Sequence, residues 1–212
     1  ELPNYGVFDE KRYFSSGDDS FLFECQNTKI GVLICEDQWV EGPISNLCQS
    51  NIDIVISLNA SPFQLNKQSE RINICKNYAL KFDITFIYVN MVGGQDEVVF
   101  DGNSFIVNNQ GEVSLQLPAF KELSVSHIDT TFTPSLASNE SLIYSAIVLA
   151  TKDYIQKNTF GGALIGLSGG IDSALTLAIA VDAIGAENVH AIMMPYQFTS
   201  DISLTDSELQ AE

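Results

Sequence analysis

The stretch Ala163–Gly185 reads ALIGLSGGIDSALTLAIAVDAIG, and it decides the fold of the second half of the chain. Its first five residues, Ala163–Leu167, are a short apolar run typical of a buried strand. Ser173–Ile184 is predicted to be a helix, and Gly185 is the residue type that often follows a helix end. Val189–Met194 is expected to be the next strand. The sequence therefore predicts a strand–helix–strand unit with parallel strands and a right-handed crossover.

The loop Gly166–Ser173 (GLSGGIDS) connects the expected strand to the expected helix. Free N–H groups and the positive end of the helix dipole face one point in such a loop, which favours phosphate binding. We expect Gly169 and Gly170 to let the backbone approach an anion without a Cβ in the way. The absence of a lysine excludes a Walker A loop. The simpler alternative is a Gly-Gly turn that only joins strand to helix.

Hydroxyl and carboxylate groups complete this loop. Ser168 and Ser173 offer hydroxyl donors, and Asp172 either caps the helix or holds a magnesium ion that bridges phosphate oxygens. The run SGGIDS resembles the SGGxDS loop of the ATP pyrophosphatases, which split ATP into AMP and pyrophosphate while they adenylate a substrate. That resemblance implies ATP binding at a set of eight positions: Gly166, Leu167, Ser168, Gly169, Gly170, Ile171, Asp172 and Ser173.

Composition narrows the class of protein. The 212 residues include 10 Lys+Arg and 27 Asp+Glu, a formal net charge of −17, which excludes a nonspecific binder of nucleic-acid backbones. Hydrophobic residues make up 45% of the chain, enough for a packed core. No apolar run reaches the roughly 18 residues of a membrane span, and no signal peptide opens the chain. The four cysteines lack CxxC spacing, so we expect neither a zinc site nor disulfides, and a cytoplasmic location.

The first half predicts a second α/β unit. The strands Lys29–Cys35 and Ile52–Leu58 are expected to be buried on both faces, because each is a continuous apolar run. The other expected elements are a helix at Asn66–Phe82, a strand at Ile84–Val92, a hairpin formed by Ser104–Val107 and Glu112–Gln116, and a strand at Leu123–Asp129.

A linker separates the two halves. The run Thr130–Asn139 is rich in Ser, Thr and Pro, and a helix is expected over Glu140–Asn158. We place the domains at residues 1–135 and 136–212.

Cys35 ends a buried strand and is followed by Glu36 and Asp37. A nucleophile at the end of a strand, on a sharp turn, is exposed to substrate while its backbone is held rigid. However, a free cysteine is among the most buried residue types, and two adjacent carboxylates raise a thiol pKa. The residues alone therefore leave open a catalytic cysteine assisted by a cation or base, and a structural one.

Three stretches resemble the nitrilase (carbon–nitrogen hydrolase) family. Gly31–Trp39 (GVLICEDQW) looks like its nucleophile segment, Leu2–Glu10 (LPNYGVFDE) like the stretch after its catalytic lysine, and Asn59–Phe63 (NASPF) like its substrate-binding loop. These hydrolases use Glu, Lys and Cys, and the cysteine carries an acyl group until water releases it. The resemblance implies that Cys35 is the nucleophile and that Glu10 orients the catalytic groups.

A nitrilase-like half followed by an SGGxDS half resembles the family of glutamine-dependent NAD⁺ synthetases. The stretches Leu142–Tyr154 and Asn158–Ser203, the latter including Met194–Ser203, resemble it as well. The implied fold is α/β: part of a nitrilase-like α-β-β-α sandwich, then part of a Rossmann-like parallel ATP-pyrophosphatase domain. The implied reaction amidates deamido-NAD⁺ with ammonia from L-glutamine, using ATP and Mg²⁺. We expect a homo-oligomer that binds these small molecules, and neither nucleic acid nor a membrane.

Carried over by position, the glutamine-binding residues are Tyr5, Glu36, Ser61 and Lys67, and Asp172 is the magnesium ligand. Glu10, Glu36 and Lys67 have simpler readings as surface, capping or helix-start residues. The family's catalytic lysine, its base glutamate and its deamido-NAD⁺ site are expected to lie outside this sequence, so we expect the fragment alone to be inactive. The alternatives are another nitrilase-type amidase, another adenylating ATP pyrophosphatase, or an inactive scaffold.

Overall fold

A computed structural model describes residues 1–122 and 137–212. The chain forms two compact units, one of residues 1–92 and 100–136 and one of residues 93–99 and 137–212. The predicted strand at Leu123–Asp129, most of the predicted linker and the predicted domain boundary lie outside the described residues.

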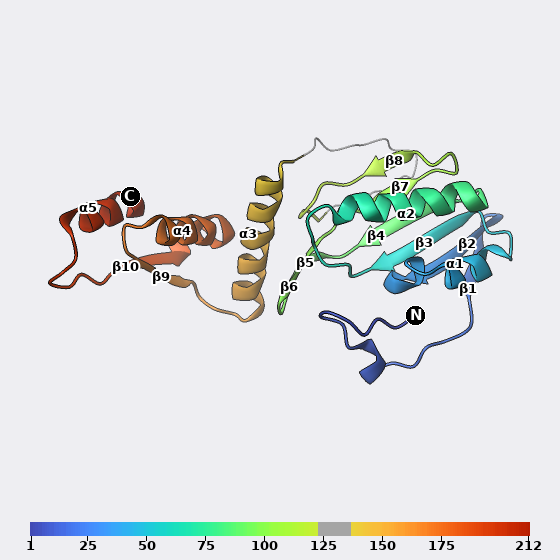
Figure 1. Ribbon diagram of the computed structural model, residues 1–212, viewed down its shortest axis with the longest axis horizontal. Helices are drawn as coiled ribbons and strands as arrows, with labels where there is room; N and C mark the ends of the chain where they lie inside the picture. Colours follow the sequence, from blue (N-terminus) through green and yellow to red (C-terminus); the bar gives the residue numbers. More distant parts are fainter. Residues whose placement is uncertain (123–136) are drawn as a thin grey trace. The chain divides into compact units, whose positions relative to one another are not determined.

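The first unit is built on a six-stranded sheet with the order β1-β2-β3-β4-β7-β8 (Figure 1). The strands β2, β3 and β4 are parallel, β1 and β7 beside them are antiparallel to them, and β8 pairs antiparallel with β7. The predicted strands and the 104–116 hairpin are confirmed. The bounds are β1 Phe21–Cys25, β2 Thr28–Ile34, β3 Ile54–Asn59, β4 Thr85–Asn90, β7 Phe105–Val107 and β8 Val113–Gln116.

Two helices, α1 (Glu41–Cys48) and α2 (Lys67–Phe82), pack on one face of this sheet. α2 was predicted from its apolar spacing, whereas α1 was not. The core between the helices and the sheet is apolar and fully enclosed, and Tyr88 stacks on Phe105 within it, with ring centroids 4.8 Å apart. Its main contributors are Leu33, Ile44, Leu47, Val55, Cys75, Ala79, Phe86, Tyr88, Phe105 and Val107.

The opposite face of the sheet is apolar and open. The register places Ile34, Leu58 and Val89 side by side on this face, and they are 65%, 49% and 41% exposed. The prediction that β2 and β3 are buried on both faces is therefore wrong for this chain. The reason is that α1 and α2 cover one side only, while the strand sequences carry apolar residues on both sides.

The tip of a short hairpin, residues 93–99, belongs to the second unit although the chain on either side of it belongs to the first. Its strands are β5 (Val92–Gln95) and β6 (Val98–Asp101), and it packs on α3 (Asn139–Lys157). The Gly94 N–H donates to Asp153 Oδ2 at 2.7 Å, and Lys157 Nζ donates to the Gly94 carbonyl at 2.5 Å. A Cβ at Gly94 would lie 2.9 Å from the Cα of Ala150, so this approach requires glycine.

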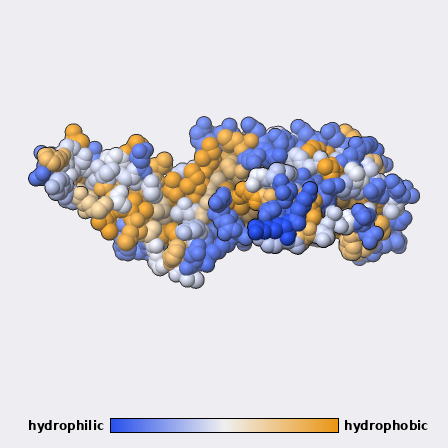
Figure 2. Space-filling view, turned by 60° about the horizontal axis from the view of Figure 1, so that its bottom comes forward, coloured by the Kyte–Doolittle hydropathy of each residue, from blue (hydrophilic) through white to orange (hydrophobic). Residues whose placement is uncertain are grey.

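The rest of the second unit is the predicted strand–helix–strand motif. β9 (Ala163–Leu167) and β10 (Val189–Met193) pair in parallel, and α4 (Ile171–Ile184) connects them. α4 begins two residues earlier than expected, and Gly185 ends it. A further helix that we did not predict, α5 (Asp201–Ala211), has Ser200 as its N-cap. Figure 2 shows apolar, orange surface over the part of the chain that carries β9 and β10, in keeping with the exposure of Leu164 and Ile192.

None of the helices in the described ranges combines the length and the apolar character that a membrane crossing requires.

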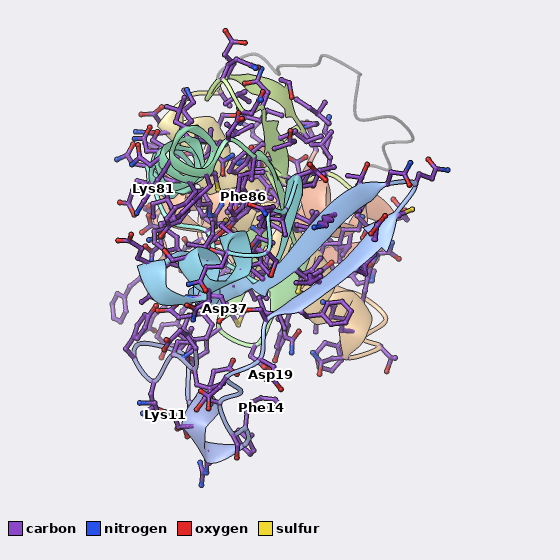
Figure 3. All side chains as sticks on the ribbon, turned by 90° about the vertical axis from the view of Figure 1, so that its right-hand side faces the viewer. Lys11, Phe14, Asp19, Asp37, Lys81 and Phe86 are labelled. Carbon is purple, nitrogen blue, oxygen red and sulfur yellow. The ribbon has the colours of Figure 1, made fainter. Side chains whose placement is uncertain are left out.

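The packing of the first unit predicts unequal effects of two truncations near α2. Phe86 lies inside the layer between α2 and the sheet and is 0% exposed, whereas Lys81 lies on the outer side of α2 (Figure 3). We expect Phe86→Ala to lower the free energy of unfolding by about 3–5 kcal/mol, because it leaves a cavity. Lys81→Ala loses an exposed ion pair with Glu41 and a cation–π contact with the Phe82 ring, and it is expected to cost about 1 kcal/mol. Urea denaturation of both variants measures the difference, and equal losses would contradict this packing.

Candidate functional site

Cys35 lies directly after β2, where the chain turns sharply. Its φ angle is +40°, a conformation that side chains other than glycine rarely adopt. The 3-10 turn Cys35–Gln38 follows, and Asp37 Oδ2 accepts the Ile34 N–H at 2.9 Å, which fixes the start of this turn. The buried Gln38 donates to Asn59 Oδ1 at 3.2 Å and so ties the turn to the end of β3. The predicted sharp turn at the strand end is confirmed.

The surroundings of Cys35 disfavour its thiolate. Burial is the largest cause and raises the pKa of the thiol, and the charges of Glu36 and Glu10 raise it further. A hydrogen bond from the Ala60 backbone N–H and the positive charge of Arg71 lower this pKa, but burial prevails. At neutral pH the group is therefore a thiol, and nucleophilic attack requires a base that takes its proton.

Two of the predicted glutamine-binding residues meet beside Cys35. The Tyr5 hydroxyl donates to Glu36 Oε2 at 2.7 Å. Burial of the phenol, followed by this hydrogen bond, raises the pKa of Tyr5 to about 12, so the phenol keeps its proton. Glu36 is thus a carboxylate held by a neutral donor, and it is suited to binding a cationic group such as an ammonium.

Ser61 lies in the loop after β3 and is buried. Its Oγ accepts from Arg71 Nη2 at 3.0 Å and from Nε at 3.3 Å. Its backbone N–H donates to Asn90 Oδ1 at 2.9 Å, and its carbonyl accepts from Arg71 Nη2 at 2.9 Å. The oxygen of Ser61 therefore serves the arginine, and its hydroxyl proton is the part left to donate to a ligand.

Lys67 begins α2 and lies on the face of Trp39, with Nζ 4.0 Å from the ring centroid. The same nitrogen contacts Glu70 Oε2 at 2.9 Å. Trp39 follows the turn that begins at Cys35, so the ammonium lies close to that turn and is oriented toward it by a cation–π contact. This position is suited to binding a carboxylate.

The charged groups beneath this site were missed by the sequence reasoning. Arg71 is 1% exposed and forms a buried ion pair with Asp101, whose oxygens lie 2.9 and 3.0 Å from Nη1. A signal was available: Arg71 precedes Cys75 and Ala79 at helical spacing, and all three lie on the buried face of α2. An arginine in line with core positions indicates a buried partner.

The second candidate site is the loop between β9 and α4. Ser168 Oγ and Ser173 Oγ lie 3.1 Å apart, Ser173 Oγ donates to the Gly170 carbonyl, and Ser168 Oγ accepts the Gly170 N–H. The two hydroxyls thus hold the loop together. Gly170 is the N-cap of α4 and provides no side-chain cap, so the first N–H groups of the helix are left for an anion.

Two details of this loop differ from expectation. Gly169 has φ +78°, and a Cβ there would lie 2.6 Å from the Ser203 carbonyl oxygen, so the glycine is required for packing beside α5 as well as for its backbone conformation. Asp172 lies in the first turn of α4 instead of at the N-cap, so the capping alternative is wrong. Its carboxylate is exposed beside the loop.

A cavity of about 470 Å³ adjoins this loop, a volume typical of small-molecule sites. It is open to solvent, and its lining combines backbone of the loop, apolar side chains that follow β10, and hydroxyl groups at the start of α5. The lining residues are Gly166, Leu167, Ser168, Met193, Met194, Pro195, Phe198, Thr199, Ser200, Ser203, Leu204 and Ser207.

Two known protein families match the two halves of the chain. The carbon–nitrogen hydrolase model matches residues 2–136, more than half of the chain. The chain belongs to the carbon–nitrogen hydrolase family. The NAD synthase model matches residues 143–212, the part that carries the loop and the cavity. This family member thus continues into an NAD synthase segment.

Two relatives resemble the chain over nearly its whole length. A glutamine-dependent NAD(+) synthetase of Acinetobacter baylyi is 48% identical over 99% of this chain. The structure of the glutamine-dependent NAD+ synthetase of Acinetobacter baumannii in complex with ADP has a TM-score of 0.90 at 47% identity, over 98% of this chain. The chain spans about 40% of the length of these relatives, 40% of the first and 41% of the second.

The fold of the hydrolase segment recurs in more distant proteins. A carbon–nitrogen hydrolase of Helicobacter pylori superimposes with a TM-score of 0.53 at 24% identity, over 57% of this chain and 47% of its own. At that identity the match shows the fold alone. The α/β fold class predicted from the sequence, nitrilase-like and then NAD synthase-like, is confirmed.

The raised pKa of Cys35 predicts slow modification of this thiol at neutral pH. In a protein of this sequence, we expect the rate of iodoacetamide alkylation at Cys35 to rise with pH, with a midpoint above that of free cysteine, because burial and Glu36 disfavour the thiolate. Peptide mass spectrometry separates Cys35 from the other three cysteines. A midpoint at or below that of free cysteine would contradict the description of this site, and Cys35→Ala is the control for peptide assignment.

Proposed function

We propose that this chain is the central part of an enzyme that converts deamido-NAD⁺ to NAD⁺, using ATP and ammonia released from glutamine. The observation that carries the proposal is the presence, in one chain, of a turn-held cysteine in a carbon–nitrogen hydrolase segment and an anion-binding loop with a cavity in an NAD synthase segment. The names of the whole-chain relatives, and the ADP in one of them, support it.

At the first site, Cys35 attacks the side-chain amide of glutamine. Glu36, held by Tyr5, binds the amino group, while Lys67 binds the carboxylate, and the Ser61 hydroxyl donates to the ligand. The Cys35 thiol gives its proton to a base, its sulfur bonds to the amide carbon, and ammonia leaves. Water then cleaves the thioester and releases glutamate. Because the pKa of Cys35 is raised, the base is essential. We assign to Glu10 the orientation of the groups around the sulfur, and its charge acts on the pKa of Cys35.

At the second site, the loop Gly166–Ser173 binds ATP phosphates through the N–H groups at the start of α4. Magnesium, held by Asp172, would offset the charge of the phosphates. The substrate carboxylate attacks the α-phosphorus and pyrophosphate leaves, which gives an adenylate. Ammonia then attacks the carbonyl carbon, and AMP leaves. The hydroxyl-lined cavity beside the loop has the volume for the nucleotide. A homo-oligomer and a cytoplasmic location stay predictions.

The nucleophile is tested in the complete gene product with two nitrogen sources. Cys35→Ala is expected to abolish glutamine-driven NAD⁺ formation, by at least about a thousandfold, because no thioester can form. Ammonia-driven formation should stay within about twofold. Cys48→Ala, which removes another thiol of the same unit, is the matched control and should retain both activities. Undiminished use of glutamine by Cys35→Ala would exclude this cysteine as the nucleophile.

The ATP loop is tested with Asp172→Asn, which keeps the size of the side chain and removes its charge. We expect slower NAD⁺ formation with glutamine and with ammonia alike, by roughly tenfold to a hundredfold, and a higher magnesium requirement. Pyrophosphate release dependent on deamido-NAD⁺ is the readout. If adenylation needs a different acceptor, another ATP pyrophosphatase activity is the better assignment. If neither activity is found in the unmodified protein, the scaffold alternative holds.

A further inference from the structure

Among the residues that the structure describes, Arg71 is the only buried arginine or lysine. The mechanism proposed above does not use it. It lies on α2, on the face that packs against the sheet, in line with Cys75 and Ala79. An arginine in such a place needs several partners, because a guanidinium has five N–H donors and a buried charge must be compensated. The partners of Arg71 are Asp101 on one side and the loop after β3 on the other.

Asp101 satisfies one side of the guanidinium. Both carboxylate oxygens accept from Nη1, at 2.9 and 3.0 Å, and Gln68 Oε1 accepts from the same nitrogen at 3.3 Å. Asp101 is itself held by Asn103, whose Nδ2 donates to Oδ2 at 2.9 Å. Asp101, at the end of β6, therefore fixes the position of the guanidinium independently of the contacts that the arginine makes with the loop after β3.

The other side of the guanidinium holds the loop after β3. Nη2 donates to the Ser61 carbonyl at 2.9 Å, to Ser61 Oγ at 3.0 Å and to the Pro62 carbonyl at 3.0 Å, while Nε donates to Ser61 Oγ at 3.3 Å. A lysine could replace the charge but could not form this planar set of contacts. The arginine therefore fixes the backbone of Ser61 and Pro62 as well as one side chain.

The loop held by Arg71 is the one that contacts the sulfur. Ala60 directly precedes Ser61, and its backbone N–H makes the hydrogen bond to Cys35. Cys35 follows β2 and Ala60 follows β3, and these strands are paired up to Ile34 and Leu58. The sulfur and the N–H that faces it thus come from different strands, and their spacing depends on how the loop after β3 is held.

We propose that Arg71 is a positioning residue for amide hydrolysis, which fixes the Ala60–Pro62 loop against the Cys35 sulfur and supplies a constant positive charge there. The proposal rests on the proposed function for the role of Cys35 as nucleophile. Asp101 orients the guanidinium but also offsets its charge, so the geometric effect and the charge effect are separable by substitution. The charged and titratable groups that face Cys35 are Glu10, Glu36 and Arg71, with the phenols of Tyr5 and Tyr88.

The test uses the complete gene product with Arg71→Lys and Arg71→Met. For each variant, kcat and KM for glutamine hydrolysis are measured, and kcat is divided by the fraction of protein whose Cys35 can be alkylated. The pH midpoint of Cys35 alkylation is measured by mass spectrometry. Arg71→Lys keeps the positive charge and loses the planar set of hydrogen bonds to Ser61 and Pro62. We therefore expect kcat to fall by at least about tenfold, while the midpoint of alkylation stays near that of the unmodified protein. Arg71→Met should also raise the midpoint by about 1 unit. KM should change less than kcat.

Lys81→Met is the matched control, because it removes a cation from the exposed side of the same helix, and it should leave kcat and midpoint unchanged. The midpoint of urea denaturation reports whether the first unit of each variant is folded. If Arg71→Met does not fold, Arg71→Lys and Asp101→Asn carry the test, since Asp101→Asn frees the guanidinium from its anchor and should lower kcat.

An unchanged kcat together with an unchanged midpoint of Cys35 alkylation would overturn the proposal. Failure of all three variants to fold would overturn it as well, because the Arg71–Asp101 ion pair would then have a structural role only. The outcome is distinct from failure of the proposed function. Cys35→Ala decides whether Cys35 is the nucleophile, whereas alkylation of Cys35 reports on Arg71 without any substrate.

Discussion

Parallel strands that end together decide where both candidate sites lie. In the first unit, Ile34, Leu58 and Val89 lie side by side at the ends of β2, β3 and β4, so the next residues of each strand converge. These residues are Cys35, Asn59 followed by the Ala60–Pro62 loop, and Asn90. In the second unit, β9 and β10 are parallel, and the segments after them line the cavity. Ligands bind outside the carboxyl ends of such strands in open α/β sheets. The same constraint therefore places one candidate site, around a thiol, in the first unit and the other, around a loop before a helix, in the second.

The two sites handle charge in opposite ways. Around Cys35 the protein buries an ion pair, keeps Tyr5 protonated and disfavours the thiolate, so reactivity depends on a proton acceptor and on precise spacing. Around Gly166–Ser173 the groups are backbone dipoles and hydroxyls in contact with solvent, and the anion is expected to come with the ligand. A negatively charged chain can bind a polyphosphate in this way, because aligned N–H groups act locally whatever the net charge is.

The sequence was informative where local pattern and tertiary structure agree. α2, β9, α4 and β10 were predicted because their apolar spacing, glycine ends and lengths all point to the same elements. α1 was missed because its eight residues include Gly42 and Pro43, which make a weak helical signal. β1 was missed because the turn at Gln26 and Asn27 has two positive φ angles in residues that carry side chains.

Candidate residues near Cys35 were found through motifs, but Arg71 and Asp101 were not. They are 30 positions apart, and neither follows a local rule that names its partner. The role of Gly169 was only partly foreseen for the same reason, since the atom that excludes a side chain there belongs to Ser203, on α5. Local chemistry can be deduced from sequence, whereas contacts between distant segments need the fold.

The hairpin of β5 and β6 means that the chain passes between the units three times, at residues 92–93, 99–100 and 136–137, and not once. Residues 93–99 pack with α3 through Gly94, Asp153 and Lys157, although the chain on either side of them belongs to the first unit. A recombinant hydrolase module cut after residue 136 would keep the hairpin and lose the helix that accepts its backbone groups. An exchange of synthase modules between relatives would need a matching hairpin as well.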